Sequence, residues 1–303
     1  MSDTSNPTTR VLGVLSLLAA HPTETFTLAE ISRRLGLSKA TTHRILSTMT
    51  DARFLSRHPA HKTFSLGVAP VAIGEAALEK HRGIDIARRE ITRLALELNV
   101  QCTLSTLVDN DTLLLAKAGT PQSHAGHQRV GERTPAILPV GIAPIAWAGE
   151  RAIAAYMAKV DGHLSEPVRA HLREALPLIR RRGYSTAVAG PAISRLRQTM
   201  ILPPDRPRDE RYWASLYRLV GELSAAEIQV FDFRDAGPHS ISHIAAPVFS
   251  PGGTVAFELL ISGMPLNLGA DAYEDYAERL KAAASVVTGE THGRMPSAAH
   301  PEP

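Results

Sequence analysis

Two short helical segments separated by a single glycine constrain the fold of this chain more than any other feature. The first begins at Thr27, and Glu30 follows three residues later, which is the spacing of a capping box at a helix N-terminus. Gly36 tolerates the left-handed backbone that ends a helix, and Ser38 is a natural N-cap for the next helix. Two helices joined by such a tight turn form the helix-turn-helix pattern. Apolar side chains at helical spacing predict the buried face of the first helix: Leu28, Ile31 and Leu35.

The segments on either side complete a small domain. An earlier helix is expected from the helical spacing of apolar residues before His21 and Pro22, which end it. Two strand-like runs, Phe54–Leu55 and Thr63–Leu66, lie on either side of Pro59, so a β-hairpin is expected after the third helix. We therefore predict a winged helix-turn-helix domain.

The helix that follows Ser38 is expected to meet double-stranded DNA. A major groove admits one α-helix, whose N-terminal half reaches the base edges, and Arg44 can bond two acceptors of a guanine. Thr41 and Thr42 are expected to point outward to bases or phosphates, and the wing to contact the backbone. The predicted DNA-binding residues are Thr27, Ser38, Lys39, Thr41, Thr42, His43, Arg44, Arg57 and Lys62.

The distribution of charge supports a phosphate-binding surface. From Glu30 to Lys62 the chain has seven Lys and Arg residues and two acids, a local surplus of five positive charges. The whole chain has a formal net charge of only +3. Ordinary helical domains also carry solvated cationic faces, so the pattern favours DNA binding over that alternative without excluding it.

A linker helix at residues 68–83 is predicted to join the first domain, residues 10–67, to a larger second domain, residues 84–288. The polar ends, residues 1–9 and 289–303, are expected to be disordered. Strands paired through hairpins and covered by helices make the second domain α+β. Its main elements are expected as helices over 145–159, 166–182 and 271–287, and as strands over 103–108, 112–116, 241–249 and 254–261.

Several classes of site are not supported by the sequence. The nucleophile elbow, the P-loop, the dinucleotide fingerprint and the zinc-protease motif are all absent. His239 and His243 would lie about 13 Å apart on a strand, too far to share a metal, and His124 with His127 is a weak pair. The single cysteine, Cys102, permits no disulfide within the chain. We expect a cytoplasmic protein with no metal, no cofactor and no catalytic residue.

The stretch FTLAEISRRLGLSKATTHRIL, residues 26–46, closely resembles the DNA-binding domain of IclR-family regulators, and residues 62–67 resemble its wing. A looser resemblance covers residues 84–184 and returns at residues 244–249 and 261–263. The resemblance implies a homodimer or dimer of dimers that binds palindromic operator DNA and senses a small organic acid or aromatic compound. It also implies a C-terminal effector-binding domain in which a curved antiparallel sheet of the GAF/PAS type lies beside the pocket.

The same resemblance indicates where the effector would bind. Residues 130–141 match the family's effector loop, and the late strands are expected opposite that loop. Ile142 and Trp147 have an alternative explanation as ordinary core residues. The predicted effector-binding residues are Gly131, Leu138, Pro139, Ile142, Trp147, His243, Ala246 and Glu258.

Two segments depart from the family pattern. Arg53 stands where the family usually has glycine before the wing, and residues 193–240 replace a short acidic loop with a proline-rich run and a helix-like stretch at residues 211–223. Three hypotheses of function therefore remain. The leading one is a ligand-responsive DNA-binding regulator. The others are an enzyme with a DNA-binding head, with Ser240 and His243 as candidates, and a DNA-binding scaffold that has lost its effector.

Overall fold

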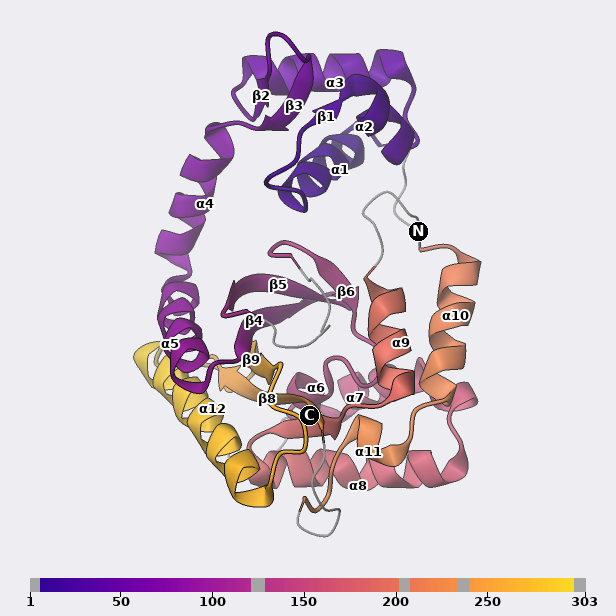
Figure 1. The fold of residues 1–303 in the computed structure, drawn as a ribbon, viewed down its shortest axis with the longest axis vertical. Coiled ribbons are helices and arrows are strands. Elements are labelled where there is room, and N and C mark those ends of the chain that lie inside the picture. The colour runs from indigo at the N-terminus through magenta and orange to yellow at the C-terminus, as the bar shows by residue number, and fades with distance from the viewer. Residues whose placement is uncertain (1–5, 121–128, 202–207, 234–239, 297–303) are drawn as a thin grey trace. The chain divides into compact units, whose positions relative to one another are not determined.

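A computed structural model describes residues 6–120, 129–201, 208–233 and 240–296 of the chain (Figure 1). After His81 the backbone passes from one compact unit to a second, larger one. In these ranges, no helix is long and apolar enough to cross a bilayer.

The first unit packs three helices against a small antiparallel sheet of order β1-β3-β2. Phe26 of β1 lies opposite Phe64 of β3, and both side chains are buried with Leu17, Ile31 and Leu46 in one apolar core. The elements are α1 (Pro7–Ala19), β1 (Phe26–Thr27), α2 (Leu28–Arg34), α3 (Lys39–Asp51), β2 (Leu55–Arg57), β3 (Thr63–Leu66) and α4 (Ala69–Lys80). This is the predicted winged helix-turn-helix, followed by the predicted linker helix.

The capping groups fix where these helices begin. The Thr27 side chain accepts a hydrogen bond from the Glu30 N–H, and the Glu30 carboxylate accepts one from the Thr27 N–H at 2.7 Å. Gly36 has a left-handed φ of 63°, and the Ser38 hydroxyl accepts from the Thr41 N–H at 3.1 Å. The capping box, the glycine turn and the second N-cap predicted from the sequence are confirmed.

Two segments that the sequence predicted to be disordered, residues 7–9 and 289–294, are folded. Helix α1 begins at Pro7, not at residue 10, because the Asn6 side chain accepts from the Thr8 N–H and proline fits the first helical turn. At the other end, the N–H groups of Gly293 and Arg294 donate to the carbonyls of Thr288 and Ser250. Residues 7–9 and 289–294 therefore belong to the folded structure.

The turn between α3 and the wing is built on Arg53. Its φ of 60° lies in the left-handed region, which costs a non-glycine residue about 1 kcal/mol. Its carbonyl oxygen accepts from the Ala69 N–H at 3.1 Å, and Gly67 lies directly against it. A Cβ atom on Gly67 would approach the Arg53 oxygen to 2.3 Å, so glycine is required at position 67.

The second unit is a six-stranded antiparallel sheet, of order β6-β5-β4-β9-β8-β7, with helices around it (Figure 1). The strands are β4 (Gln101–Val108), β5 (Asp111–Ala118), β6 (Arg133–Pro135), β7 (Ser185–Val188), β8 (Ile241–Phe249) and β9 (Val255–Ser262). The helices are α5 (Arg82–Leu98), α6 (Ile142–Ala146), α7 (Glu150–Ala158), α8 (Glu166–Arg182), α9 (Pro191–Met200), α10 (Glu210–Gly221), α11 (Ala225–Ile228) and α12 (Ala270–Glu290). The α+β fold class is confirmed.

One predicted helix is divided. Residues 145–159 were expected to form a single helix, but α6 ends at Ala146 and α7 starts at Glu150. Gly149, with a ψ of 159°, has the extended backbone of an N-cap residue and separates the two helices.

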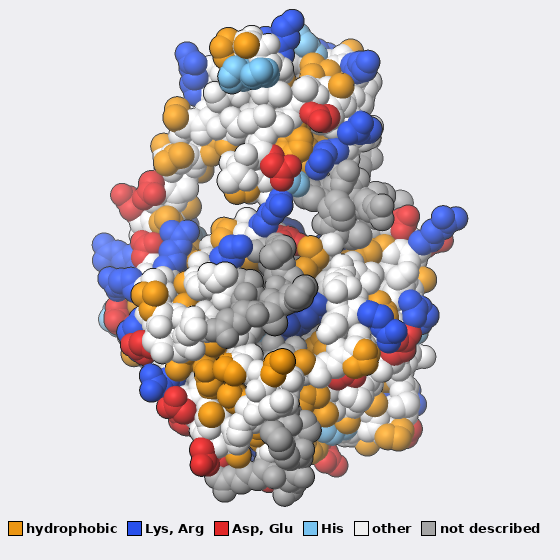
Figure 2. Space-filling view, viewed as in Figure 1, with side chains coloured by type: hydrophobic (Ala, Val, Ile, Leu, Met, Phe, Trp, Pro, Cys, Tyr) orange, Lys and Arg blue, Asp and Glu red, His pale blue; other side chains and the backbone are white. Residues whose placement is uncertain are grey.

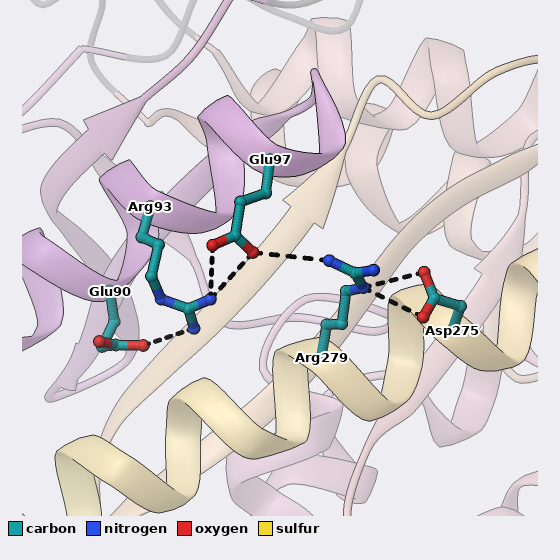
Figure 3. Close-up of polar contacts among 5 residues, drawn as sticks. All are labelled: Glu90, Arg93, Glu97, Asp275 and Arg279. Carbon is teal, nitrogen blue, oxygen red and sulfur yellow. Dashed lines mark hydrogen bonds and ion pairs between the residues drawn. The ribbon is translucent and has the colours of Figure 1, made fainter.

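Helices α5 and α12 cover one face of the sheet. Alternate strand residues, among them Cys102, Leu104 and Ile244, are buried with Ile91 and Leu280 in the main core. The Glu97–Arg279 salt bridge also joins α5 to α12, and pairs within each helix extend it (Figure 3). Exposed ion pairs stabilise a fold by about 0–1 kcal/mol each, so the apolar contacts dominate this packing. The network comprises Glu90, Arg93, Glu97, Asp275 and Arg279.

We predict that Gly67→Ala lowers the free energy of unfolding of the first unit by about 1–3 kcal/mol, because the new methyl group overlaps the Arg53 carbonyl. Gly74→Ala in α4 is the matched control, since a Cβ there has no neighbour within 4 Å. Alanine is the better helix former, so Gly74→Ala should be neutral or stabilise by up to about 1 kcal/mol. Urea unfolding followed by circular dichroism measures both, and equal effects would contradict the prediction.

Candidate functional site

The N-terminal half of α3 presents polar side chains to solvent. Lys39, His43 and Arg44 are exposed, as are Arg57 and the neighbouring histidines of the β2–β3 hairpin. Figure 2 shows basic and histidine side chains on the surface of this unit, at the top of the view. The sequence-predicted cations Lys39, Arg44, Arg57 and Lys62 form no ion pair with any carboxylate in the described part of the chain. Their charge is therefore available to an external anion.

A groove between α3 and the hairpin brings five of the predicted DNA-binding residues together. Its volume is about 470 Å³, and one acidic side chain, Asp51, lies on its wall. The predicted residues on the wall are Thr27, Lys39, His43, Arg57 and Lys62. Cations on both the helix and the hairpin give the groove the chemistry of a phosphate-backbone contact.

Thr42 does not face outward, contrary to the sequence prediction. Its side chain is fully buried, and its hydroxyl donates to the Ser38 carbonyl at 3.0 Å. The residue lies four positions before Leu46, on the core face of α3. Thr41 is half-buried and accepts a hydrogen bond from the Ser38 hydroxyl at 2.9 Å. The outward surface of α3 thus excludes Thr42.

The second unit contains a cavity of about 110 Å³ against the sheet face that α5 and α12 leave uncovered. Residues of all six strands line it, and alternate residues of β4, β9, β8 and β7 form much of its floor, among them Thr103, Leu260, Ala245 and Ser185. The loop before α6 and the helix α9 close it from other sides. Four predicted effector-binding residues line this cavity: Pro139, Ile142, His243 and Glu258.

The structure does not bring the other four predicted effector residues to the cavity wall. Ala246 lies on the opposite face of β8, in the core with α5 and α12, because successive strand residues alternate. Trp147 packs edge-on against Phe249, with ring centroids 5.6 Å apart. Leu138 is fully buried, and Gly131 is exposed in a turn with a φ of 88°.

Arg197 of α9 is the cavity residue that the sequence analysis missed. Its guanidinium donates to Nδ1 of His243 at 3.1 Å. Because an arginine N–H is a donor only, Nδ1 must be unprotonated, and the imidazole proton is on Nε2. Burial, and then the charge of Arg197, lower the pKa of His243 to about 3. Burial lowers the pKa of Arg197 to about 10, so the pair carries one positive charge at neutral pH.

A signal for Arg197 was present in the sequence. Ile193, Leu196 and Met200 follow helical spacing and are buried, and Arg197 lies one turn after Ile193 on the same face. A cation on the apolar face of a helix is unusual unless it has a buried partner.

Glu258 and Ser185 are the other polar groups of note on the wall. Burial raises the pKa of Glu258 to about 7, so its carboxyl is partly protonated near neutrality. Ser185 is 1% exposed, and its hydroxyl has no hydrogen-bond partner within the described structure. The cavity wall is mixed, because polar side chains lie among apolar ones, as a site for a polar ligand requires. Besides Ser185, Arg197, His243 and Glu258, the wall includes Gln101, Thr103, Ser105, Thr112, Thr134 and Ser262.

No metal centre is formed by the described residues, since no three His, Cys, Asp or Glu side chains gather there. His124, His127 and His239, the weak candidates from sequence, lie outside those residues. Cys102 is buried in the core, and burial raises the pKa of its thiol to about 12.

Comparison with known proteins identifies relatives of both units. The IclR helix-turn-helix domain model matches residues 7–59. The HTH-type transcriptional regulator XynR of Escherichia coli (strain K12) is 26% identical over 171 residues. That match covers 55% of this chain and 66% of XynR, slightly less than two thirds of its length.

Two crystal structures share the fold across nearly the whole chain. An IclR transcriptional regulator from Alicyclobacillus acidocaldarius has a TM-score of 0.65 at 19% identity, covering 94% of this chain and 98% of that one. An IclR homolog from Microbacterium hydrocarbonoxydans, complexed with 4-hydroxybenzoate, has a TM-score of 0.63 at 21% identity, covering 94% and 99%. With the winged helix-turn-helix and the antiparallel sheet described above, these matches show that the chain contains an IclR-type helix-turn-helix domain and is similar to IclR-family transcriptional regulators.

Proposed function

We propose that this protein is a ligand-responsive transcription regulator of the IclR family. The first unit binds operator DNA through α3 and the wing, and the second unit binds a small organic molecule in the cavity beside its sheet. The observation that carries the proposal is the pairing, in one chain, of a cationic groove between α3 and the wing with a polar-lined cavity in the second unit. Ligand binding would favour one arrangement of the DNA-binding units over another and so change operator affinity.

The chemistry of the effector follows from the cavity wall and is supported by a relative. The wall offers apolar surface together with a guanidinium, an imidazole and a carboxyl group. An IclR homolog with the same fold was crystallised with 4-hydroxybenzoate, an aromatic acid. We therefore propose an organic acid or aromatic compound as the effector class.

We also propose that the protein works as a homodimer or a dimer of dimers. Helix α4 is rich in apolar residues, yet none of them is buried within the chain. Val71 is 62% exposed and Ile73 is 55% exposed. A second copy of α4 would remove this surface from water.

A regulator that binds chromosomal DNA acts where the chromosome lies, so we propose a cytoplasmic location.

The two other hypotheses fit the geometry less well. An enzyme would use His243 as a general base, but with a pKa of about 3 and Nδ1 bonded to Arg197 it is a poor base at neutral pH. A scaffold without an effector has no need for a cavity lined with buried polar groups. We therefore favour the regulator.

Arg44→Ala should weaken operator binding and relax base preference, with a loss of about 1–3 kcal/mol if its guanidinium reads a guanine. Lys39→Ala should weaken binding evenly across sequences and reduce the slope of log affinity against log salt by about one. Titrations of operator and scrambled duplexes by fluorescence anisotropy measure both effects. Arg211→Ala, an exposed arginine of the second unit, is the control that should change neither. Unaltered binding by both α3 variants would remove α3 from the interface.

Filling the cavity should abolish the ligand response and spare DNA binding. Ala245 is a small residue on the cavity wall, so Ala245→Phe places a ring in the space, whereas Ala245→Ser leaves it open. A thermal-shift screen of carboxylic acids and aromatic compounds, including 4-hydroxybenzoate, identifies compounds that stabilise the protein. These compounds should alter operator affinity in the native protein and in Ala245→Ser only. A full response in Ala245→Phe would place the ligand elsewhere.

Val71→Glu should lower the oligomeric state, because it places a charge on the exposed apolar surface of α4. Glu75→Gln, on the same exposed helix, is the matched control and should leave the assembly unchanged. Light scattering coupled to gel filtration measures the mass of each variant. A native protein that is monomeric at micromolar concentration, or a Val71→Glu variant of native mass, would exclude α4 as the interface.

A further inference from the structure

One wall of the cavity carries a positive charge that no described carboxylate neutralises. Arg197 is half-buried, and the described residues provide no carboxylate that pairs with it. Its one side-chain partner is His243, which is neutral, whereas a guanidinium has five N–H donors. Hydrogen bonds to a charged group are worth more than neutral ones, so the unused donors favour an anionic acceptor in the cavity.

Two further donors lie beside this charge. With Nδ1 occupied by Arg197, the remaining N–H of His243 is on Nε2. On the adjacent strand, Ser185 lies opposite Ala245, two residues along β8 from His243 and therefore on the same face. The Ser185 hydroxyl is buried and has no hydrogen-bond partner among the described residues, which is unfavourable unless a ligand supplies one. A guanidinium, an imidazole N–H and a hydroxyl are together a set of donors that suits a carboxylate.

The carboxyl group of Glu258 lies towards the other end of the cavity floor. Glu258 of β9 is paired with Pro247 of β8, which is four residues from His243. At about 3.3 Å per residue, the two positions are separated by roughly 13 Å along the strand. A ligand that reaches both therefore carries its carboxylate at one end and a hydroxyl or similar hydrogen-bonding group at the other.

The position of Arg197 is fixed by a second carboxylate. Glu227 accepts hydrogen bonds from the N–H groups of Ala192 and Ile193, both at 3.1 Å, at the start of α9. It also accepts from the Ser224 N–H at 3.0 Å at the start of α11. Glu227 is thus a positioning residue for α9 and for the guanidinium that α9 carries.

We infer that Arg197, together with His243 and Ser185, binds the carboxylate of an organic acid and so anchors the ligand. Glu258 forms a hydrogen bond to a polar group at the other end of the same ligand. The inference rests on the proposed function of the cavity and names the residues and the ligand class of that site. It assigns the anchor to α9, whose Arg197 lies in the segment that the sequence analysis expected to depart from the family pattern.

The test compares acids with their uncharged amides on the full-length protein by isothermal titration calorimetry. The probes are benzoate, 4-hydroxybenzoate, phenylacetate, the three matching amides and inorganic phosphate, each at up to millimolar concentration. We expect at least one acid to bind and its amide to bind about 10- to 100-fold more weakly. Arg197→Met should remove the preference for the acid over the amide. Arg195→Ala, an exposed arginine on the same helix, should retain it.

Further variants keep the result decisive. Arg197→Lys retains the charge without the planar fork, so it should keep a reduced preference for acids even if Arg197→Met folds poorly. Glu258→Leu should remove a preference of 4-hydroxybenzoate over benzoate, whereas Glu258→Gln should keep part of it.

The inference would be overturned if every acid failed to bind, if acid and amide bound with equal affinity, or if an Arg197→Met protein still preferred the acid. Phosphate binding as tight as that of the acids would indicate a general anion site and would also overturn the carboxylate assignment. A neutral compound that binds the cavity and changes operator affinity would overturn this inference but keep the proposed regulator. Loss of operator binding in the native protein would instead remove the proposed function.

Discussion

The second unit depends on a sheet whose two faces have different surroundings: helices cover one face, and the other lines the cavity. Because side chains alternate along a strand, Ile244 and Ala246 are buried against helices while His243 and Ala245 point to the cavity. The helix-covered face supplies the apolar burial that stabilises the unit. The other face can then carry polar groups such as Glu258 that would be unfavourable in an apolar core. A cavity beside the sheet follows from this division.

The helices of the first unit depend on hydrogen bonds between backbone N–H groups at their starts and side chains a few residues away in the sequence. Thr27 and Glu30 satisfy the free N–H groups at one helix start, and Ser38 does so at the next. The left-handed residues Gly36 and Arg53 then set the directions in which the chain enters and leaves α3. With α3 held at both ends, its exposed face is presented as a rigid surface, which a base-reading helix requires.

These local features are why the sequence alone predicted most of the first unit. A capping box and a helix-ending glycine act within a few residues, so they can be recognised without knowledge of the rest of the fold. Thr42 was misplaced because hydroxyl groups are common on both faces of a helix, and only the burial of Leu46 one turn later settles its direction. The sheet strands were also recognised, but Ala246 was assigned to the cavity because periodicity does not say which face of a strand is covered.

Arg197 was harder to predict, because its role depends on contacts distant in sequence. It is 46 residues from His243, and α9 is joined to Glu227, which lies 35 residues after Ala192. The resemblance to IclR-family regulators gave no guidance, because the sequence analysis expected residues 193–240 to depart from the family pattern.

The hydrogen bonds of Glu227 have a consequence for how such a protein can diversify. A single carboxylate links the first turns of α9 and α11, so these two helices are held together where each begins. Residues on the cavity side of α9 can be exchanged without disturbing the apolar core between the sheet and helices α5 and α12. Substitutions there can therefore change which compound the cavity accepts, while the exposed surface of α3 in the first unit stays as it was.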